Sequence, residues 1–217
     1  MRVVTMRAGL VLGMAALALA ASDLRAQASG FIVGGGLSTT LSGDDIGDGF
    51  ESDGGIFVSG GMGYPINERL GFGWSLSYGE RGWNETGVQK VEVDYIGIGL
   101  NISTGFTLSE SAGVGLSVGP VLNLKAKCEV TDVNGTVNCD DGANINPYGV
   151  DYGIAAAGSI GYSISERFGI GVGAQYELGL RPLAQFKNGD RAGEDWEAKW
   201  RSVSVGVGIS FAIGGGS

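Results

Sequence analysis

The chain has 217 residues, a formal net charge of −9 at pH 7, 42 glycines and no histidine. The acidic balance, without any cluster of Lys and Arg, excludes nucleic acid as an expected partner, because phosphate binding needs clustered basic side chains. The lack of histidine excludes histidine-based acid–base or nucleophilic catalysis. We therefore expect a protein that is not an enzyme and that has no cofactor and no metal centre.

The first 28 residues have the layout of a secretory signal peptide. The basic segment MRVVTMR precedes an apolar run from Ala8 to Ala20, and the small-residue sequence AQA follows at residues 26–28. The apolar run is shorter than the ~20 residues that a helix needs to cross a bilayer. We expect cleavage after residue 28, which leaves residues 29–217 as one exported domain.

From residue 29 onward, apolar residues alternate with small or polar ones, which is typical of strands with two different faces. In LGFGWSLSY, residues 70–78, the even positions are large and apolar, and the odd positions are glycine or serine. Eight such segments lie at about 30–41, 55–66, 69–83, 90–106, 112–127, 147–164, 167–181 and 198–212. This pattern predicts an all-β fold, an eight-stranded antiparallel up-and-down transmembrane β-barrel.

The connections between these segments alternate in length. The phrases INERLG and ISERFG form near-identical short connections, whereas residues 42–54, 128–146 and 182–197 form long polar ones. Short periplasmic turns and long outer loops are expected of outer-membrane barrels. Aromatic girdles are expected at both lipid interfaces, and we assign six residues to the outer end: Tyr78, Trp83, Tyr95, Tyr148, Tyr152 and Trp200.

Cys128 and Cys139 are the only cysteines, and they enclose the polar stretch CEVTDVNGTVNC. An exported chain meets an oxidising compartment, so we expect these cysteines to form a disulfide that closes a loop. In the chain-entropy model, such a disulfide contributes about 3 kcal/mol to stability.

Charged residues on the small, polar strand face are expected to point into the lumen. Seven of them lie in the outer halves of their strands: Arg81, Glu92, Asp94, Lys125, Asp151, Glu177 and Arg181. Buried charges persist only when they are paired, so we expect these residues to form one network. An eight-stranded interior is just wide enough for side chains to fill. The network then either plugs the barrel or gates a narrow path.

The stretch SLSYGERGW followed by VDYIGIGLN resembles the outer-membrane protein β-barrel domain family. The resemblance covers most of residues 29–213 and implies a small barrel of the OmpA and OmpX type in the outer membrane of a bacterium, in contact with outer-membrane lipid and lipopolysaccharide. Such barrels commonly close on a C-terminal aromatic residue that the barrel assembly machinery reads. Here Phe211 is followed by AIGGGS. Either Phe211 is the assembly signal from an internal position, or the chain departs from this assembly route.

Three functions remain open at this point. The first is a non-enzymatic integral outer-membrane barrel that supports envelope structure or surface interaction through its extracellular loops. The second is a small gated pore or transporter for ions or small solutes, which the Gly and Ser lining favours. The third is a soluble lipocalin-like barrel, in which the apolar face would point inward around a ligand.

Overall fold

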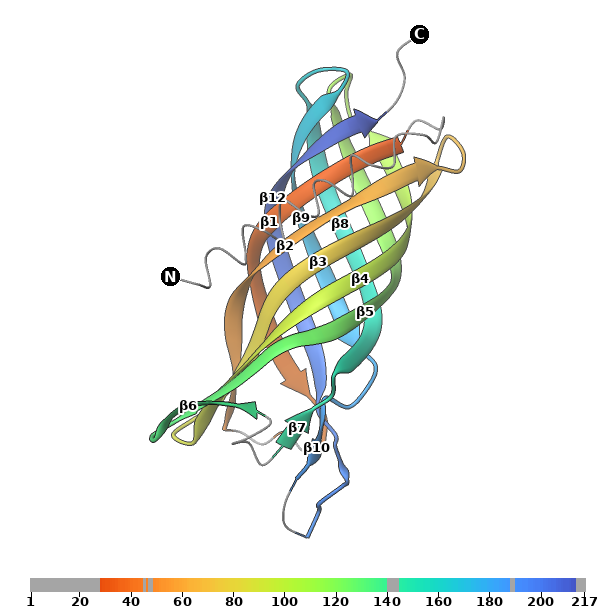
Figure 1. Ribbon diagram of the computed structural model, residues 1–217. Coiled ribbons are helices and arrows are strands. Elements are labelled where there is room, and N and C mark those ends of the chain that lie inside the picture. Colours follow the sequence, from red (N-terminus) through yellow and green to blue (C-terminus); the bar gives the residue numbers. More distant parts are fainter. Residues whose placement is uncertain (1–27, 45, 47–48, 140–144, 188–189, 214–217) are drawn as a thin grey trace.

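The computed structural model describes residues 28–44, 46, 49–139, 145–187 and 190–213. Eight long strands form a closed antiparallel barrel (Figure 1): β1 (Ala28–Ser42), β2 (Phe50–Pro65), β3 (Leu70–Glu85), β4 (Gln89–Thr107), β5 (Ala112–Asp132), β8 (Val150–Ser163), β9 (Phe168–Gly179) and β12 (Lys199–Ile213). Consecutive barrel strands pair along the chain, and β12 pairs with β1 to close the sheet. The eight-stranded fold is therefore confirmed. The expected signal peptide, residues 1–28, lies outside the described residues except for Ala28, which begins β1.

Large apolar side chains cover the outside of the barrel. Ile98 and Ile102 of β4 and Val205 and Val207 of β12 are exposed, by 42–67%. Their neighbours in sequence, such as Gly97, point inward and are small. An apolar outer surface matches the lipid that surrounds a membrane barrel. The alternative of a soluble lipocalin-like barrel is wrong, because in that fold the apolar face would line the interior.

The short turns at one end of the barrel share one structure. In INERLG, the Asn67 side-chain oxygen accepts hydrogen bonds from the backbone N–H groups of Arg69 and Leu70, each at 2.9 Å. In ISERFG, the Ser165 hydroxyl oxygen accepts equivalent bonds from the N–H groups of Arg167 and Phe168, at 3.3 and 3.2 Å. The repeated phrase therefore encodes the same side-chain-capped turn twice. Short turns mark the periplasmic end of an outer-membrane barrel, so the opposite end is the outer one.

At the outer end, several strands continue past the barrel. β6 (Gly135–Asn138) pairs with the end of β5, which itself pairs with β4. We call β6 and the outer ends of β3, β4 and β5 the extracellular sheet. A second small sheet consists of β7 (Ile145–Pro147), β10 (Ala184–Phe186) and β11 (Asp195–Trp196). The connections that the sequence predicted as polar loops, 128–146 and 182–197, therefore contain these short strands.

A β-bulge in β5 separates the barrel from the extracellular sheet. Asp94 pairs with Lys127, but the next residue, Tyr95, pairs with Lys125, so Ala126 is an extra residue. One inserted residue exchanges the two faces of a strand. Odd-numbered residues of β5 therefore face inward before the bulge, and even-numbered residues such as Cys128 face inward after it.

Close contact between β1 and β12 requires glycine at one of the three consecutive glycines, 34–36. A Cβ atom at Gly35 would lie 2.0 Å from the carbonyl oxygen of Val205, whereas one at Gly36 would have nothing within 4 Å. We expect Gly35→Ala to lower the free energy of unfolding by about 1–3 kcal/mol, as overpacking does. Gly36→Ala is expected to leave it unchanged or to raise it by about 0.5 kcal/mol. Urea titration of both refolded variants checks this, and equal effects would contradict the close approach of the two strands at Gly35.

Candidate functional site in the outer half of the barrel

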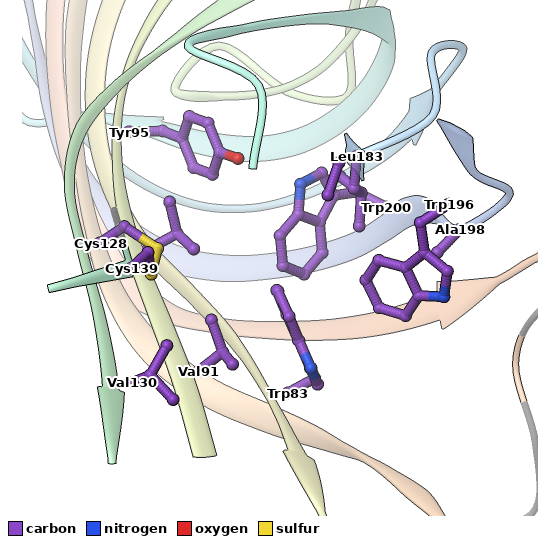
Figure 2. Packing of buried hydrophobic residues seen from close by; sticks show 12 residues of the cluster. Trp83, Val91, Tyr95, Cys128, Val130, Cys139, Leu183, Trp196, Ala198 and Trp200 are labelled. Atoms are coloured by element: carbon purple, nitrogen blue, oxygen red, sulfur yellow. A yellow bond between two sulfur atoms is a disulfide. The ribbon is translucent and has the colours of Figure 1, made fainter. Parts of the chain in front are cut away.

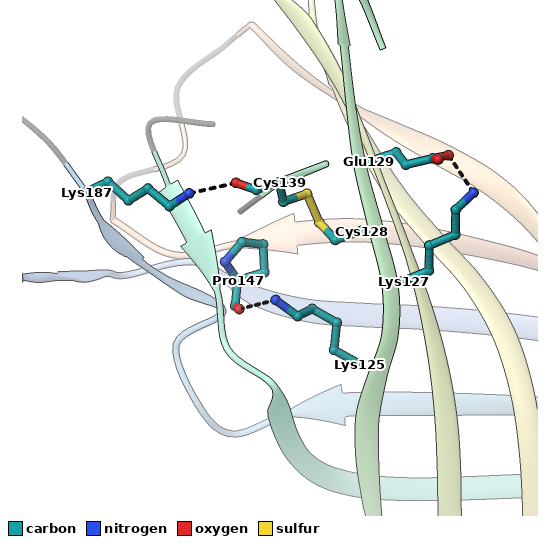
Figure 3. The surroundings of a disulfide bond; sticks show 7 residues. All are labelled: Lys125, Lys127, Cys128, Glu129, Cys139, Pro147 and Lys187. Atoms are coloured by element: carbon teal, nitrogen blue, oxygen red, sulfur yellow. Dashed lines mark hydrogen bonds and ion pairs between the residues drawn. A yellow bond between two sulfur atoms is a disulfide. The ribbon is translucent and has the colours of Figure 1, made fainter. Parts of the chain in front are cut away.

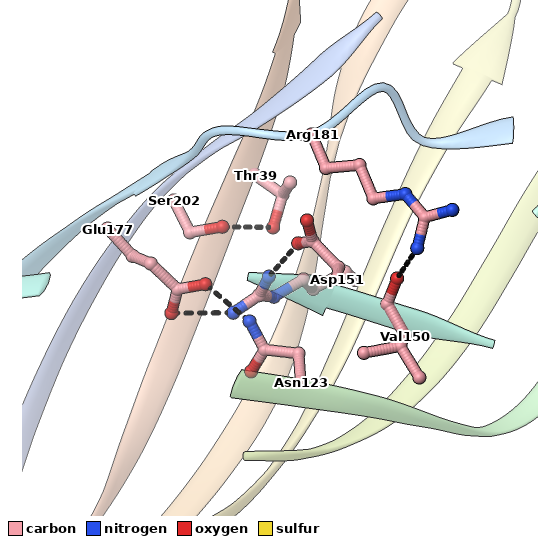
Figure 4. A network of polar contacts seen from close by, with 8 residues as sticks. Thr39, Asn123, Val150, Asp151, Glu177, Arg181 and Ser202 are labelled. Carbon is pink, nitrogen blue, oxygen red and sulfur yellow. Dashed lines mark hydrogen bonds and ion pairs between the residues drawn. The ribbon is translucent and has the colours of Figure 1, made fainter. Parts of the chain in front are cut away.

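Three charged side chains meet in the barrel lumen near its outer end (Figure 4). Arg81 comes from β3, and its two partners, both labelled in Figure 4, are Asp151 of β8 and Glu177 of β9. The Arg81 Nη2 atom donates to Glu177 Oε2 at 2.7 Å, and Arg81 Nη1 lies 3.9 Å from Asp151 Oδ2. All three side chains are at most 6% exposed. We call these three residues the charged cluster. Its ion pairs join β3 across the lumen to β8 and β9, which are adjacent strands.

Neutral polar side chains complete the surroundings of the charged cluster. Asn123 of β5 donates from Nδ2 to the second carboxylate oxygen of Glu177, at 2.7 Å. Each oxygen of Glu177 therefore has its own donor, which stabilises a buried carboxylate. On the adjoining wall, the hydroxyl oxygens of Thr39 and Ser202 lie 3.4 Å apart. Asn123 was not among the predicted lumen residues, although its odd position in β5 matches that of the inward-facing Ser117.

Two residues expected in the lumen network lie on the other face of their strand. Glu92 and Asp94 share the even positions of β4 with the lipid-facing Ile96 and Ile98, and the side chain of Glu92 is 52% exposed. Asp94 accepts a hydrogen bond from the hydroxyl of Tyr78 at 2.5 Å. Placing Glu92 and Asp94 in the lumen was wrong. Beyond the lipid, an outward position meets water, so a polar side chain there no longer marks the inward face.

Lys125 and Arg181 lie near the charged cluster, but they donate hydrogen bonds to backbone carbonyls. The Lys125 Nζ atom donates to the carbonyl oxygen of Pro147 in β7, at 3.0 Å. Arg181 follows the end of β9, where Nη1 donates to the carbonyl oxygen of Val150 at 3.1 Å and the guanidinium lies 3.8 Å from the ring centre of Tyr148. Both side chains thus hold the backbone of β7 and of the outer end of β8, whereas the sequence placed them among the lumen acids.

An apolar cluster, which we call the cover, lies beyond the charged cluster at the outer end of the barrel (Figure 2). Its members are Trp83, Val91, Val93, Tyr95, Cys128, Val130, Cys139, Leu183, Ala184, Trp196, Ala198 and Trp200. The ring centre of Trp83 lies 5.4 Å from that of Trp196 and 5.6 Å from that of Trp200. The Arg81 guanidinium lies 5.4 Å from the ring centre of Tyr95, so the cover rests directly on the charged cluster.

Three aromatic residues of the cover were predicted at the lipid interface. Trp83, Tyr95 and Trp200 are instead almost fully buried, at 1–2% exposure. Their positions give the reason: Trp83 has the same odd numbering as the inward-facing Arg81 on β3, and Trp200 has the same even numbering as Ser202 on the inward face of β12. The alternation within each strand indicates the inward face for Trp83 and Trp200, whereas their aromatic character alone suggested the lipid interface. Tyr152 does lie on the outer surface, at 49% exposure.

The disulfide between Cys128 and Cys139 is present, as expected, and it lies inside the cover (Figure 3). Lys187 donates from Nζ to the carbonyl oxygen of Cys139 at 2.7 Å and so joins the disulfide to the segment after β10. In the neighbouring loop, the Tyr148 hydroxyl donates to Asp195 of β11. Desolvation, and then the bond to Asp195, raise the pKa of Tyr148. The disulfide and these contacts hold the loops over the barrel mouth.

Removing the disulfide with Cys128→Ser/Cys139→Ser is expected to lower the free energy of unfolding by about 3 kcal/mol, the chain-entropy value for a loop of this length. Urea titration of the refolded proteins measures the change. As a control, a reducing agent is added to both proteins. It should lower the midpoint of the urea transition for the wild type and leave that of the double variant unchanged. Equal stability of the oxidised wild type and the double variant would contradict a structural role for the bond.

Between the charged cluster and the periplasmic turns lies a cavity of about 510 Å³. Glycine and polar side chains such as Ser77, Asn101 and Gln175 form much of its lining. Apolar side chains such as Phe57 and Val33 also line it, and a Cβ atom at Gly206 would approach both of these at 2.9–3.0 Å. The lumen is therefore open space in its inner half and packed side chains in its outer half.

The outward face of the extracellular sheet carries exposed ion pairs. Lys90 Nζ lies 3.1 Å from Asp53 and 3.2 Å from Glu92, and Lys127 Nζ lies 2.6 Å from Glu129. Individually, exposed pairs of this type contribute at most about 1 kcal/mol. Together, these ion pairs present a mixed but mainly acidic surface above the membrane.

The described residues contain no group of three or more His, Cys, Asp or Glu side chains that would hold a metal ion. Within the same ranges, no helix is long and apolar enough to cross a membrane.

The closed sheet, the apolar outer surface and the covered outer end define a small integral β-barrel of the outer membrane. A family model described as outer membrane protein beta-barrel domain matches residues 9–211, and the chain belongs to this family. It is thus an outer-membrane protein of bacterial type, as the sequence predicted.

Two solved structures show the same fold at low sequence identity, and a third is similar to the chain at a lower TM-score. Neisserial surface protein A is 13% identical, with a TM-score of 0.50 over 84% of this chain and 96% of that chain. OprG from Pseudomonas aeruginosa is 12% identical, with a TM-score of 0.50 over 86% and 97%. Ail, the attachment invasion locus protein of Yersinia pestis, is 13% identical, with a TM-score of 0.44 over 85% and 99%. No curated protein matches the sequence.

Proposed function

We propose that the protein is a non-enzymatic barrel, closed at its outer end, that presents the extracellular sheet for contacts at the cell surface. The observation that supports this most directly is the cover, which fills the outer mouth with apolar side chains above a buried ion pair. A closed mouth leaves the surface above it as the part available to partners. The disulfide and the ion pairs of the extracellular sheet give that surface a fixed shape.

Charge reversal tests whether this surface makes contacts. Glu92→Lys/Glu129→Lys changes two carboxylates on the outward face of the extracellular sheet, and Glu68→Lys/Glu166→Lys changes two in the periplasmic turns as a matched control. Adhesion of cells to coated surfaces and resistance of the envelope to detergent should change in the first variant only. Unchanged adhesion and unchanged resistance in the first variant, at equal surface levels, would refute the proposal.

A second function, a narrow gated pore, is favoured by the 510 Å³ cavity below the charged cluster. In that case, the Arg81–Glu177 pair and the cover would be the gate, and a variant that disrupts them would conduct ions. Conductance through the unmodified protein distinguishes the two functions, since only the pore passes current.

We further propose that residues 1–28 direct export and that Phe211 is the signal for barrel assembly. Phe211 lies on the outer face, where its ring covers Gly30 so closely that a Cβ atom at Gly30 would approach the ring to 2.4 Å. It therefore also packs the seam between β1 and β12. Assembly by purified barrel assembly machinery should be slower for Phe211→Ala than for Phe168→Ala, which removes the paired aromatic of β9. Equal rates would argue against this role for Phe211.

A further inference from the structure

Two basic side chains at the outer end of the barrel have no partner among the described residues. Lys199 and Arg201 of β12 make neither an ion pair nor a side-chain hydrogen bond there. The other described basic residues of this end contact carboxylates or backbone carbonyls: Arg81, Lys90, Lys125, Lys127, Arg181, Lys187 and Arg191. The charges of Lys199 and Arg201 are thus uncompensated within this part of the chain.

Both side chains lie where the lipid-facing stripe of β12 ends. Toward the periplasmic end, the same outward face of β12 continues with Val203, Val205, Val207 and Ile209, which are 47–67% exposed. The eight residue steps from Val203 to Phe211, at ~3.4 Å each and with a strand tilt of ~40°, span about 21 Å along the membrane normal. This length approaches the ~25 Å apolar band of outer-membrane barrels. Arg201 and Lys199 therefore lie at the level of the lipid headgroups of the outer leaflet.

The neighbouring strands add no negative charge to this position. Arg201 pairs with Thr40 of β1 and Leu178 of β9, and Lys199 pairs with Ser42 of β1. The hydroxyls of Thr40 and Ser42 donate to the backbone carbonyls of the two basic residues, at 3.2 and 3.5 Å. None of these paired residues is acidic, so the paired strands place no carboxylate against the two cations.

We propose that Lys199 and Arg201 bind a phosphate group of a phosphorylated lipid in the outer leaflet. An arginine fork beside a lysine ammonium provides the donors that phosphate oxygens accept. The occupant is a lipid because the apolar stripe below the two cations contacts acyl chains when the headgroup is bound. The site anchors the seam between β1 and β12 to the headgroup layer, and it does not depend on the proposed role of the extracellular sheet.

Binding of lipid A to the refolded protein in uncharged detergent tests the proposal, with the intact lipid and the same lipid after removal of its phosphates as probes. Each basic residue near an anionic lipid surface contributes about fivefold in affinity, so Lys199→Gln/Arg201→Gln is expected to bind intact lipid A about 30-fold more weakly. The matched control is Arg69→Gln/Arg167→Gln, which removes two exposed cations from the periplasmic turns and should keep wild-type affinity. Exchange of the cations, Lys199→Arg/Arg201→Lys, should also retain binding.

Heat-dependent gel mobility confirms the folding of each variant before titration. Tighter binding of intact than of dephosphorylated lipid A by the wild type, lost only in the Lys199→Gln/Arg201→Gln variant, supports the site. Equal binding of the two lipids, or equal losses in the two glutamine variants, overturns it. Full competition by inorganic phosphate at equal concentration also overturns it, because the site then recognises free phosphate and not a lipid.

Discussion

Trp83→Ala is expected to lower the free energy of unfolding by about 3–5 kcal/mol, the range for removing a fully buried tryptophan. Trp83 is 1% exposed and contacts the rings of both Trp196 and Trp200. Its loss leaves a cavity at the centre of the cover, where three chain segments meet. Urea titration of the protein refolded into bilayers measures the change.

Trp74 is the matched control for this substitution. It lies on the same strand, β3, but on the lipid-facing side and only partly buried. Trp74→Ala removes an equally large ring without opening the cover, so a clearly smaller loss of stability is expected. If the two substitutions have equal effects, the cover does not stabilise the outer end.

Glu177→Ala is expected to lower the free energy of unfolding by about 3 kcal/mol, the low end of the range for breaking a buried pair. The substitution removes the carboxylate that accepts from both Arg81 and Asn123. Asp151, 3.9 Å from Arg81, remains to offset part of the buried charge, and for this reason we expect the low end. The same urea titration provides the measurement.

Glu92→Ala is the control for Glu177→Ala, because it breaks an ion pair of similar length on the exposed face of β4. Breaking such an exposed pair is expected to lower the free energy of unfolding by at most about 1 kcal/mol. Similar losses for both glutamates would mean that the charged cluster contributes no more than a surface contact.

The barrel strands could be predicted from the sequence because the membrane imposes a simple rule. Lipid outside and a narrow lumen inside force large apolar and small residues to alternate, as in residues 70–78. The repeated turns were also predictable, since Asn67 and Ser165 are short polar residues that cap the backbone of a turn.

The outer end could be predicted only in part, because the rule ends where the lipid ends. Above the membrane, an outward side chain meets water, and Glu92 therefore had the polarity expected of a lumen residue. The bulge at Ala126 exchanges the faces of β5, and no sequence pattern marks it. The cover depends on contacts between distant segments, such as Trp83 with Trp196, which the alternation within single strands does not contain.

The central claim, that the outer end of the barrel is closed, is tested most directly by single-channel conductance of the refolded protein in a planar bilayer. With insertion confirmed independently, the closed barrel predicts no stable conductance steps from the wild-type protein. Stable, reproducible steps from the wild-type protein would contradict the closed outer end and favour the gated pore.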